Sequence, residues 1–306
     1  MMTDIEPALR ALTDFFLAPS ADSKRLFHGR GGCYPGLEGC VIDVFSPTVL
    51  VTFFDEPESG LLAKISAHIQ ARLPCEYFDR LAVQHRYLTS APIQWLIGEP
   101  LVDSFAQRGK TRFHLRYTRQ NVGFFLDMEN GRRWLEARAQ GCNVLNLFSY
   151  TCAFSVIAQV AGALKVVNVD MSRAALTTGR DNHHLNQLPT DSIQFMPLDI
   201  LKSWSRIRKP GPYDIVIIDP PSFQKGSFIA SRDYKKVVRR LRDLVRPGGD
   251  VLACLNAPEL GAQFLVDVFA EFAPECRFVE RVSPPKVFCD VNAERQLKLL
   301  HFQRSN

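Results

Sequence analysis

Three aspartates in the second half of the chain follow apolar runs that are typical of buried strands. Asp170, Asp199 and Asp219 come after residues 165–169, 193–196 and 213–218, respectively. Ligands of open α/β sheets bind at the carboxyl ends of the strands, so we expect these carboxylates to lie along one edge. There, Asp170 is placed to accept hydrogen bonds from a ribose diol, and Asp199 is placed to face the amino group of a base. For Asp199 a plain helix cap is the alternative interpretation.

The stretch from Asn143 to Asp170 organises this part of the chain. It predicts a buried strand (143–147), a tight polar turn (148–151), a helix (152–160) and a second strand (165–169). Backbone amides of such a turn, at the amino end of the helix, can hold an anionic or polar group of a nucleotide-like ligand. An ordinary βαβ unit without a ligand is the alternative.

A second motif begins at Asp219, where the sequence runs Asp219-Pro220-Pro221-Ser222-Phe223. Two consecutive prolines fix a rigid turn that leaves backbone carbonyls exposed. Such a turn is suited to hold a planar base, and a helix cap or an ordinary loop explains it less well.

The pattern of the remaining chain predicts how these residues are positioned. Strands and helices alternate after Val122, with strands expected at 143–147, 165–169, 193–196, 213–218, 249–255, 276–283 and 295–302. Helices are expected at 152–161, 172–187, 199–207, 231–245 and 260–272, after a helix that ends near Arg138 and has Asp127 as its N-cap. The alternation indicates an α/β protein with a Rossmann-like, doubly wound seven-stranded sheet that ends in an antiparallel hairpin. We therefore divide the chain into a small α+β domain (1–118) and a nucleotide-binding domain (119–306).

Composition narrows the class of protein. The 306 residues are 46% hydrophobic and 23% charged, as in an ordinary globular protein, and no apolar run approaches the length of a membrane span. The polar first residues predict no secretory signal, which makes a cytoplasmic location the default. The eight cysteines form no C-x-x-C pair, so we expect neither a metal site nor disulfides. The net charge of +5 permits a nucleic-acid partner without requiring one.

The most basic stretch lies in the first domain and comprises Arg108, Lys110, Arg112, His114, Arg116 and Arg119. Strand alternation places Arg112, His114 and Arg116 on one face and apolar residues on the other. An ordinary solvated face is one interpretation of this basic strip (108–119), and contact with RNA phosphates is the other. The segment 24–39 combines Arg25, His28 and Arg30 with five glycines. It reads either as a turn-rich entry into a sheet or as a loop that approaches a phosphate backbone.

Several motifs together resemble a known family. They are Gly123-Phe-Phe-Leu-Asp127, Asn146-Leu-Phe-Ser-Tyr-Thr151, Val169-Asp-Met-Ser172 and Asp219-Pro-Pro-Ser-Phe223, with Pro35-Gly-Leu37 and Val41-Ile-Asp-Val-Phe45 upstream. Over roughly residues 22–303 the chain resembles class I S-adenosylmethionine-dependent methyltransferases, and within them the 23S ribosomal RNA base methyltransferases, of the I and K/L types.

The resemblance implies which residues hold the cofactor and which meet the base. The implied S-adenosylmethionine contacts are Phe125, Asp127, Asn146, Phe148, Ser149, Tyr150, Thr151, Asp170, Met171, Asp199 and Asp219. Residues 148–150 would line the methionine part, Asp170 the ribose, Asp199 the adenine, and Asp219 the edge nearest the methyl group. The catalytic set would be Asp219, Pro220, Pro221, Phe223 and Asn256, and the RNA contacts would be Arg108, Lys110, Arg112, Arg116 and Arg119.

One branch of this family methylates carbon 5 of cytosine by way of a cysteine thiolate. Aligning residues 251–256 with the fifth strand puts Asn256 at the position of that nucleophile, and Cys254 falls two residues earlier. The chain therefore looks closer to the guanine-nitrogen branch, the K half of the K/L enzyme, and Arg295-Gln296-Leu297 also resembles that branch. Cys254 as a nucleophile is the lesser alternative.

The sequence departs from the family at two positions, with Cys152 in place of a glycine and Glu129 in place of a basic residue. The favoured interpretation is a methyltransferase that modifies a base of structured RNA, with ribosomal RNA as its partner. A degenerate member that binds RNA or a protein without catalysis is one alternative. An enzyme that methylates a small molecule or a protein is another. The oligomeric state stays open, with a homodimer among the options.

Overall fold

The computed structural model describes residues 3–224 and 228–306, without the side chains of Phe223 and Gln224. The chain forms two compact units. The first contains the residues up to Leu126 together with Lys286–Ala293, and the second contains Asp127–Pro285 and Glu294–Asn306. The division predicted from the sequence, into a small α+β domain (1–118) and a nucleotide-binding domain (119–306), stays a prediction.

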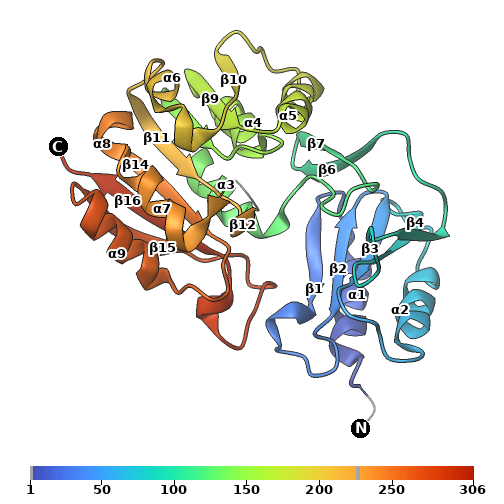
Figure 1. Ribbon diagram of the computed structural model, residues 1–306. Helices are drawn as coiled ribbons and strands as arrows, with labels where there is room; N and C mark the ends of the chain where they lie inside the picture. The colour runs from blue at the N-terminus through green and yellow to red at the C-terminus, as the bar shows by residue number, and fades with distance from the viewer. Residues whose placement is uncertain (1–2, 225–227) are drawn as a thin grey trace. The chain divides into compact units, whose positions relative to one another are not determined.

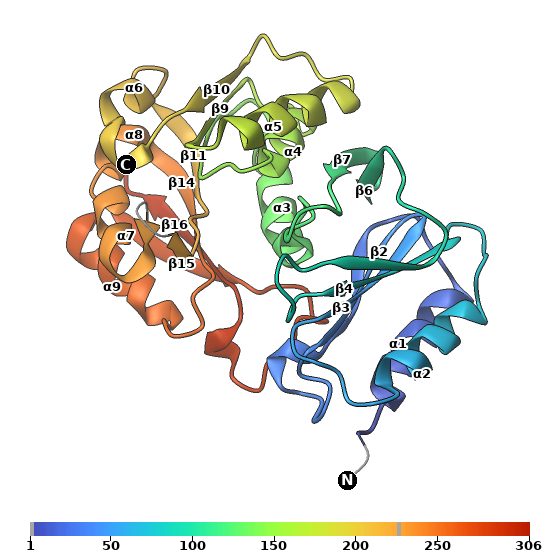
Figure 2. The ribbon, with the colours of Figure 1, turned by 45° about the vertical axis from the view of Figure 1, so that its right-hand side comes forward.

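The first unit is built on a five-stranded sheet with the order β1-β2-β3-β4-β5. Its strands are β1 (Lys24–His28), β2 (Cys40–Phe45), β3 (Thr48–Phe53), β4 (Arg80–His85) and β5 (Ile93–Ile97). Neighbouring strands are antiparallel except β3 and β4, which are parallel and connected through α2 (Leu61–Gln70). Helix α1 (Glu6–Leu17) packs beside α2, as Figure 2 shows, and both bury apolar side chains in the core of this unit.

A two-stranded hairpin of β6 (Ser104–Arg108) and β7 (Thr111–Leu115) completes the first unit. Sequence analysis missed β6, whose residues Ser104 to Arg108 are mostly polar. It also missed β1, because segment 24–39 was interpreted as a turn-rich entry into a sheet.

The second unit contains a seven-stranded sheet with the order β10-β9-β8-β11-β14-β16-β15. The strands are β8 (Asn143–Leu147), β9 (Lys165–Asp170), β10 (Ile193–Pro197), β11 (Tyr213–Ile218), β14 (Val245–Leu255), β15 (Cys276–Val282) and β16 (Lys298–Arg304). The strands β10, β9, β8, β11 and β14 are parallel, whereas β16 pairs antiparallel with both β14 and β15. The predicted α/β class, with a Rossmann-like seven-stranded sheet, a closing hairpin and a smaller N-terminal unit, is confirmed.

Helices cover both faces of this sheet (Figure 1). One face carries α3 (Glu129–Glu136), α4 (Ala153–Val160) and α5 (Arg173–Leu185), and the other carries α6 (Trp204–Arg208), α7 (Ala230–Val238), α8 (Leu241–Leu244) and α9 (Ala262–Phe272). Because both faces are covered, the central strand β11 is buried along its whole length, which explains its apolar run from Ile215 to Ile218. Two short strands, β12 (Phe223–Gln224) and β13 (Phe228–Ile229), pair after the Asp219 motif.

Three predictions for the helices of this unit need correction. The expected helix 231–245 is divided into α7 and α8, and residue 245 already belongs to β14. The expected helix 199–207 is a 3₁₀ turn followed by the short α6. Asp127 is not an N-cap, because it lies inside a 3₁₀ helix (Leu126–Met128) and Met128 precedes α3. Over residues 3–224 and 228–306, no helix has the length and apolarity that a bilayer crossing requires.

Candidate active site

The register of the central strands brings the predicted residues to one edge of the sheet. Leu147 at the end of β8 pairs with Val169 of β9 on one side and with Ile218 of β11 on the other. The next residues are therefore Phe148, Asp170 and Asp219, side by side at the carboxyl ends of three adjacent strands. The chain continues from β8 to β9 on one side and returns as β11 on the other, so this is the point where the strand order reverses. Such a switch point is where open α/β sheets bind ligands.

The turn after β8 has an unusual backbone. Phe148, Tyr150 and Cys152 have φ angles of 59°, 45° and 59°, all in the left-handed region that residues other than glycine avoid. Each such residue costs about 1–3 kcal/mol and persists only where its surroundings enforce it. Three within five residues, at a switch point, indicate a turn shaped for binding.

Hydrogen bonds from the neighbouring elements hold this turn. The carboxylate of Asp170 accepts from the backbone N–H of Tyr150 (2.9 Å) and from that of Ser172 (2.8 Å). The fully buried side-chain amide of Asn182, in α5, donates to the carbonyl of Thr151 (2.9 Å). Asp170 thus fixes the turn and also lies at its predicted place beside it.

The side chain of Cys152 is buried between the turn, where its sulfur approaches Ser149 and the carbonyl of Tyr150, and helix α5. Its sulfur is fully buried against Gly179 of α5, where an added Cβ would lie only 2.4 Å from Sγ. Burial raises the pKa of this thiol to about 12, so it stays protonated at neutral pH. The missing family glycine is therefore compensated by a second glycine on the facing helix, and the turn keeps its shape.

The carboxyl of Asp219 has a higher pKa than that of an ordinary aspartate. Burial, and then the negative charge of Asp127, raise the pKa of its carboxyl to about 7, while the positive charge of Arg132 opposes the shift. The residue remains partly accessible to solvent. A half-buried carboxyl with this pKa can take up or release a proton near neutral pH, and a nearby cation would stabilise its ionised form.

Sequence analysis missed Arg132, which is almost completely buried in α3 and whose charge reaches Asp219. Its Nε lies 3.3 Å from a carboxylate oxygen of Glu129, and the other oxygen accepts from Arg133 at 2.9 Å. The spacing offers a signal, because Arg132 lies between Met128 and Leu135 on the apolar face of the helix. A basic residue at such a position is rarely buried without a partner. The acidic Glu129 therefore lies beside the buried guanidinium of Arg132, three residues later in the helix.

The end of β14 separates the two candidate nucleophile positions. Cys254 is fully buried, and burial, followed by the charge of Asp219, raises the pKa of its thiol well above the usual value. Asn256, two residues on, is exposed, and its carbonyl accepts a hydrogen bond from the hydroxyl of Ser222 in the Asp219 motif. The structure therefore brings Asn256 together with this motif and buries Cys254.

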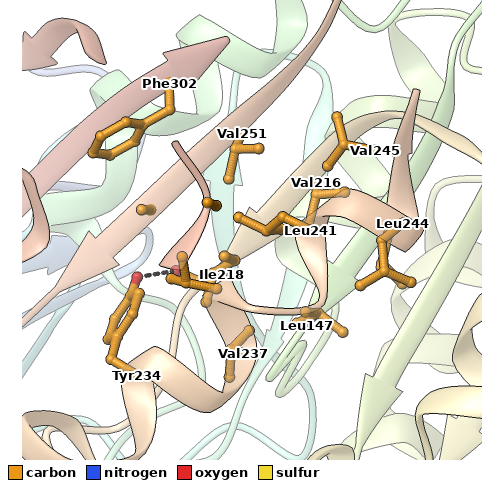
Figure 3. Close-up of a cluster of buried hydrophobic side chains, with 14 of the residues drawn as sticks. Leu147, Val216, Ile218, Tyr234, Val237, Leu241, Leu244, Val245, Val251 and Phe302 are labelled. Atoms are coloured by element: carbon orange, nitrogen blue, oxygen red, sulfur yellow. Dashed lines mark hydrogen bonds between the residues drawn. The ribbon is translucent and has the colours of Figure 1, made fainter. Parts of the chain in front are cut away.

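Tyr234 of α7, which sequence analysis also missed, contacts the ends of both β11 and β14. Its buried hydroxyl lies 3.1 Å from the carbonyl oxygen of Cys254 and 3.4 Å from that of Ile218. Figure 3 shows the ring among the buried side chains of this face, beside Ile218. The residues that follow β11 and β14 are consequently held by the same side chain.

The other predicted cofactor residues of this unit have varied surroundings. Asn146 is buried and donates to Asn168 (3.0 Å), which in turn donates to Ser155 (2.9 Å). Asp199 accepts from the N–H of Leu201 (3.0 Å), which is the capping geometry of the alternative interpretation, and it also pairs with Lys202 (3.2 Å).

The remaining positions differ mainly in exposure. Ser149, Thr151 and Pro220 are buried, Phe148, Tyr150, Asp127 and Pro221 are half-buried, and Met171 is exposed. The side chain of Phe223 lies outside the described part of the chain. Phe125 belongs to the first unit, where it is exposed, and its place over the cofactor stays a prediction.

The basic strip in the first unit has the predicted alternation. Along β7, Thr111, Phe113 and Leu115 are buried, whereas Arg112 is exposed and His114 half-buried. Lys110, Arg116 and Arg119 are exposed in the adjoining turns, and Arg108 is half-buried at the end of β6. Contact of this strip with RNA stays a prediction.

The packing of Cys152 against Gly179 gives a stability test. We expect Gly179→Ala to lower the free energy of unfolding by about 1–3 kcal/mol, because the added methyl overpacks the thiol. The double variant Gly179→Ala/Cys152→Gly should recover most of this loss, since glycine suits the positive φ and leaves room for the methyl. Denaturant unfolding measures both. Thr177→Ala, at an exposed position of the same helix, is the control, and additive losses in the double variant would contradict the pairing.

Comparison with known proteins agrees with the geometry of this site. Residues 24–303 match the family model of an S-adenosylmethionine-dependent methyltransferase. The ribosomal RNA large subunit methyltransferase I of Erwinia tasmaniensis is 30% identical over 289 residues, which cover 90% of this chain and 72% of that protein. The protein of the same name from Yersinia pseudotuberculosis is 30% identical over 259 residues, covering 80% of this chain and 65% of its own length.

Solved structures give the same fold. A methyltransferase crystallised in complex with SAH has a TM-score of 0.85 with this chain at 23% identity, over 99% of this chain and 82% of that one. The family match extends over both units and includes the turn after β8, Asp170 and the Asp219 motif. The chain belongs to the S-adenosylmethionine-dependent methyltransferases, and its cofactor is S-adenosylmethionine.

Proposed function

We propose that the protein methylates a base of structured RNA, most simply a guanine nitrogen of 23S ribosomal RNA, in the bacterial cytoplasm. The RNA substrate is supported by the two relatives, both named as large subunit ribosomal RNA methyltransferases, and by the basic strip of the first unit. The observation that carries the choice of atom is the end of β14, where Cys254 is buried and protonated and Asn256 is exposed.

The cofactor supplies an activated methyl group on a sulfonium. The residues present fit this group, because the turn after β8 lies at the switch point of the sheet and the Cys152 thiol is buried against Gly179 and does not occupy the exposed edge. We assign the methionine part to Phe148, Ser149 and Tyr150, and the ribose to Asp170. Asp127 and Asp219 add negative charge near the end of β11, which favours a cationic ligand.

The base is assigned to the turn formed by Asp219, Pro220 and Pro221, with Asn256 beside it. A nitrogen with an available lone pair forms its bond to the methyl carbon directly as the carbon–sulfur bond breaks, so no covalent enzyme intermediate is required. Where the methylated nitrogen carries a hydrogen, as the amino group of guanine does, a proton then leaves it, and Asp219, with a pKa of about 7, can accept it. The chain's own contribution is to orient the base and exclude water.

The choice between a guanine nitrogen and carbon 5 of cytosine rests on the residues of this chain. The two relatives do not decide it, because their names state no methylated atom. The alternative of a degenerate member rested on Cys152 and Glu129. Gly179 accommodates the thiol and Arg132 lies beside the carboxylate, so neither residue argues against catalysis.

Cofactor binding is the first test of this proposal. We expect micromolar binding of S-adenosylmethionine and S-adenosylhomocysteine in calorimetric titrations, and its loss in Asp170→Ala, which removes both the ribose acceptor and the support of the turn. Asp191→Ala, at an exposed position beyond α5, should bind normally. If the wild-type protein bound neither compound, the catalytic assignment would have to be abandoned in favour of a binding role.

The end of β14 predicts the behaviour of Cys254→Ala. Because the thiol is buried and protonated, we expect transfer of labelled methyl groups to ribosomal RNA from a deletion strain to continue, with methylguanine as the product by mass spectrometry. A catalytic nucleophile would instead lose about 10³-fold or more in rate. A loss of that size with cofactor binding intact, or a covalent adduct with RNA containing 5-fluorocytosine, would establish the cytosine mechanism.

The raised pKa of Asp219 predicts proton release on cofactor binding. Below pH 7 the free protein holds a proton on this carboxyl, and the positive sulfonium favours its ionised form. The affinity for S-adenosylmethionine should therefore increase between about pH 5 and pH 7, whereas that for neutral S-adenosylhomocysteine should change less. Titrations in buffers of different ionisation enthalpy measure the released proton, which Asp219→Asn should abolish. Equal proton release with both compounds would place Asp219 away from the sulfonium.

A further inference from the structure

A rigid loop of the first unit presents one arginine to solvent. Arg30 lies in a 3₁₀ turn between Gly29 and Gly31, both of which are buried. A Cβ on Gly29 would lie 1.7 Å from the carbonyl oxygen of Leu37, and one on Gly31 would lie 1.7 Å from that of Cys289. Neither position can accept a side chain, so the backbone on both sides of Arg30 is fixed by close packing.

A second arginine shares the aromatic ring on which Arg30 rests. The guanidinium carbon of Arg30 is 4.0 Å from the centroid of the Phe54 ring, and that of Arg86 is 4.8 Å from the same centroid. Phe54 follows β3 and Arg86 follows β4, and these two strands pair in parallel through Phe53 and His85. The sheet register therefore places the ring and the second guanidinium next to each other. We call Arg30, Arg86 and Phe54 the arginine clamp.

The two arginines of the clamp bring positive charge together, and among the described residues no carboxylate contacts either of them. Within residues 3–224 and 228–306, neither Arg30 nor Arg86 has an acidic oxygen within 4 Å, whereas nearby Arg25 is held by both oxygens of Asp43 (2.7 and 2.9 Å). Partial desolvation of the guanidinium, and then the charge of Arg25, lower the pKa of Arg30, whereas the more distant charge of Asp55 raises it. Partial desolvation, and then the charge of Arg30, lower the pKa of Arg86. Crowded guanidinium groups of this kind gain stability from an anion.

The clamp is continuous with the basic strip. Nη1 of Arg86 lies 3.5 Å from the side-chain oxygen of Asn121, and the side chain of Gln84, in β4, approaches the carbonyl of Gln120 at 3.4 Å. Both contacts are made to the turn 116–122, which carries the exposed Arg116 and Arg119. Four arginines from three separated segments thus lie along one region of the first unit.

We propose that the arginine clamp binds phosphates of the RNA backbone, a role that rests on the proposed function. A guanidinium that lies over the Phe54 ring makes no hydrogen bond to it, and the fork of its N–H donors matches two oxygens of one phosphate. Such contacts carry no base specificity. They supply affinity and orientation, and they make binding sensitive to salt.

The test measures binding of 23S ribosomal RNA, transcribed in vitro, between about 50 and 300 mM KCl. We expect Arg30→Gln and Arg86→Gln each to weaken binding several-fold at low salt. The double variant should reduce the slope of log K against log salt by about 1.4–1.8, as expected when two phosphate contacts are lost. Arg10→Gln, which removes an exposed arginine of α1, should match the wild type. A double variant with the affinity and slope of the wild type would overturn the clamp.

Two further variants separate charge from geometry. Arg30→Lys keeps the charge but not the planar fork, and Phe54→Leu removes the ring while leaving both arginines, so both should weaken RNA binding. Thermal unfolding checks that every variant is folded. If the double variant lost binding of poly-glutamate by the same factor while keeping that of RNA, the clamp would be a site for acidic protein, and the proposal would be wrong.

Cofactor titration of the same variants distinguishes the clamp from the proposed function. Clamp variants that lose RNA binding while binding S-adenosylmethionine normally would support both. Loss of RNA binding in a protein that binds no cofactor and transfers no methyl group would retain the clamp and refute the methyltransferase assignment. Normal cofactor binding and methyl transfer with unchanged RNA binding would refute the clamp alone.

Discussion

The strained turn between β8 and α4 is the feature on which the catalytic edge depends. Three of its residues hold left-handed backbone conformations that cost energy and that glycine would adopt more easily. Asp170 secures it from β9, Asn182 secures it from α5, and Gly179 leaves room for the Cys152 side chain. The neighbouring strand and helix therefore supply the energy that keeps the turn in a binding shape.

The opposite side of the edge is secured in a different way. Tyr234 places one hydroxyl near the last carbonyls of β11 and β14, so that the Asp219 motif and Asn256 share a support. The hydrogen bond from the Ser222 hydroxyl to the carbonyl of Asn256 is a second link between the Asp219 motif and the end of β14. Residues from two strands, adjacent in the sheet but separated by helices in the chain, are in this way held next to each other.

Charge is distributed according to the chemistry of each part. The second unit places acidic Asp127 and Asp219 near the end of β11 beside one buried arginine, which suits a cationic cofactor. In the first unit, Arg30 and Arg86 have no acidic oxygen within 4 Å among the described residues, which suits an anionic polymer. A methyltransferase of RNA needs both, since its two ligands have opposite charge.

The sequence by itself determined the fold class, the seven-strand alternation and the edge residues Asp170 and Asp219, because strand periodicity and strand-end position are local properties. It also identified Asn256 and Cys254 as the two positions to compare. Only the tertiary structure decided that Cys152 faces Gly179, 27 residues away, that Arg132 is buried near Asp219, and that Arg30 and Arg86 share one ring. These are contacts between distant segments, and they depend on sheet register and helix packing, which no local pattern of residues encodes.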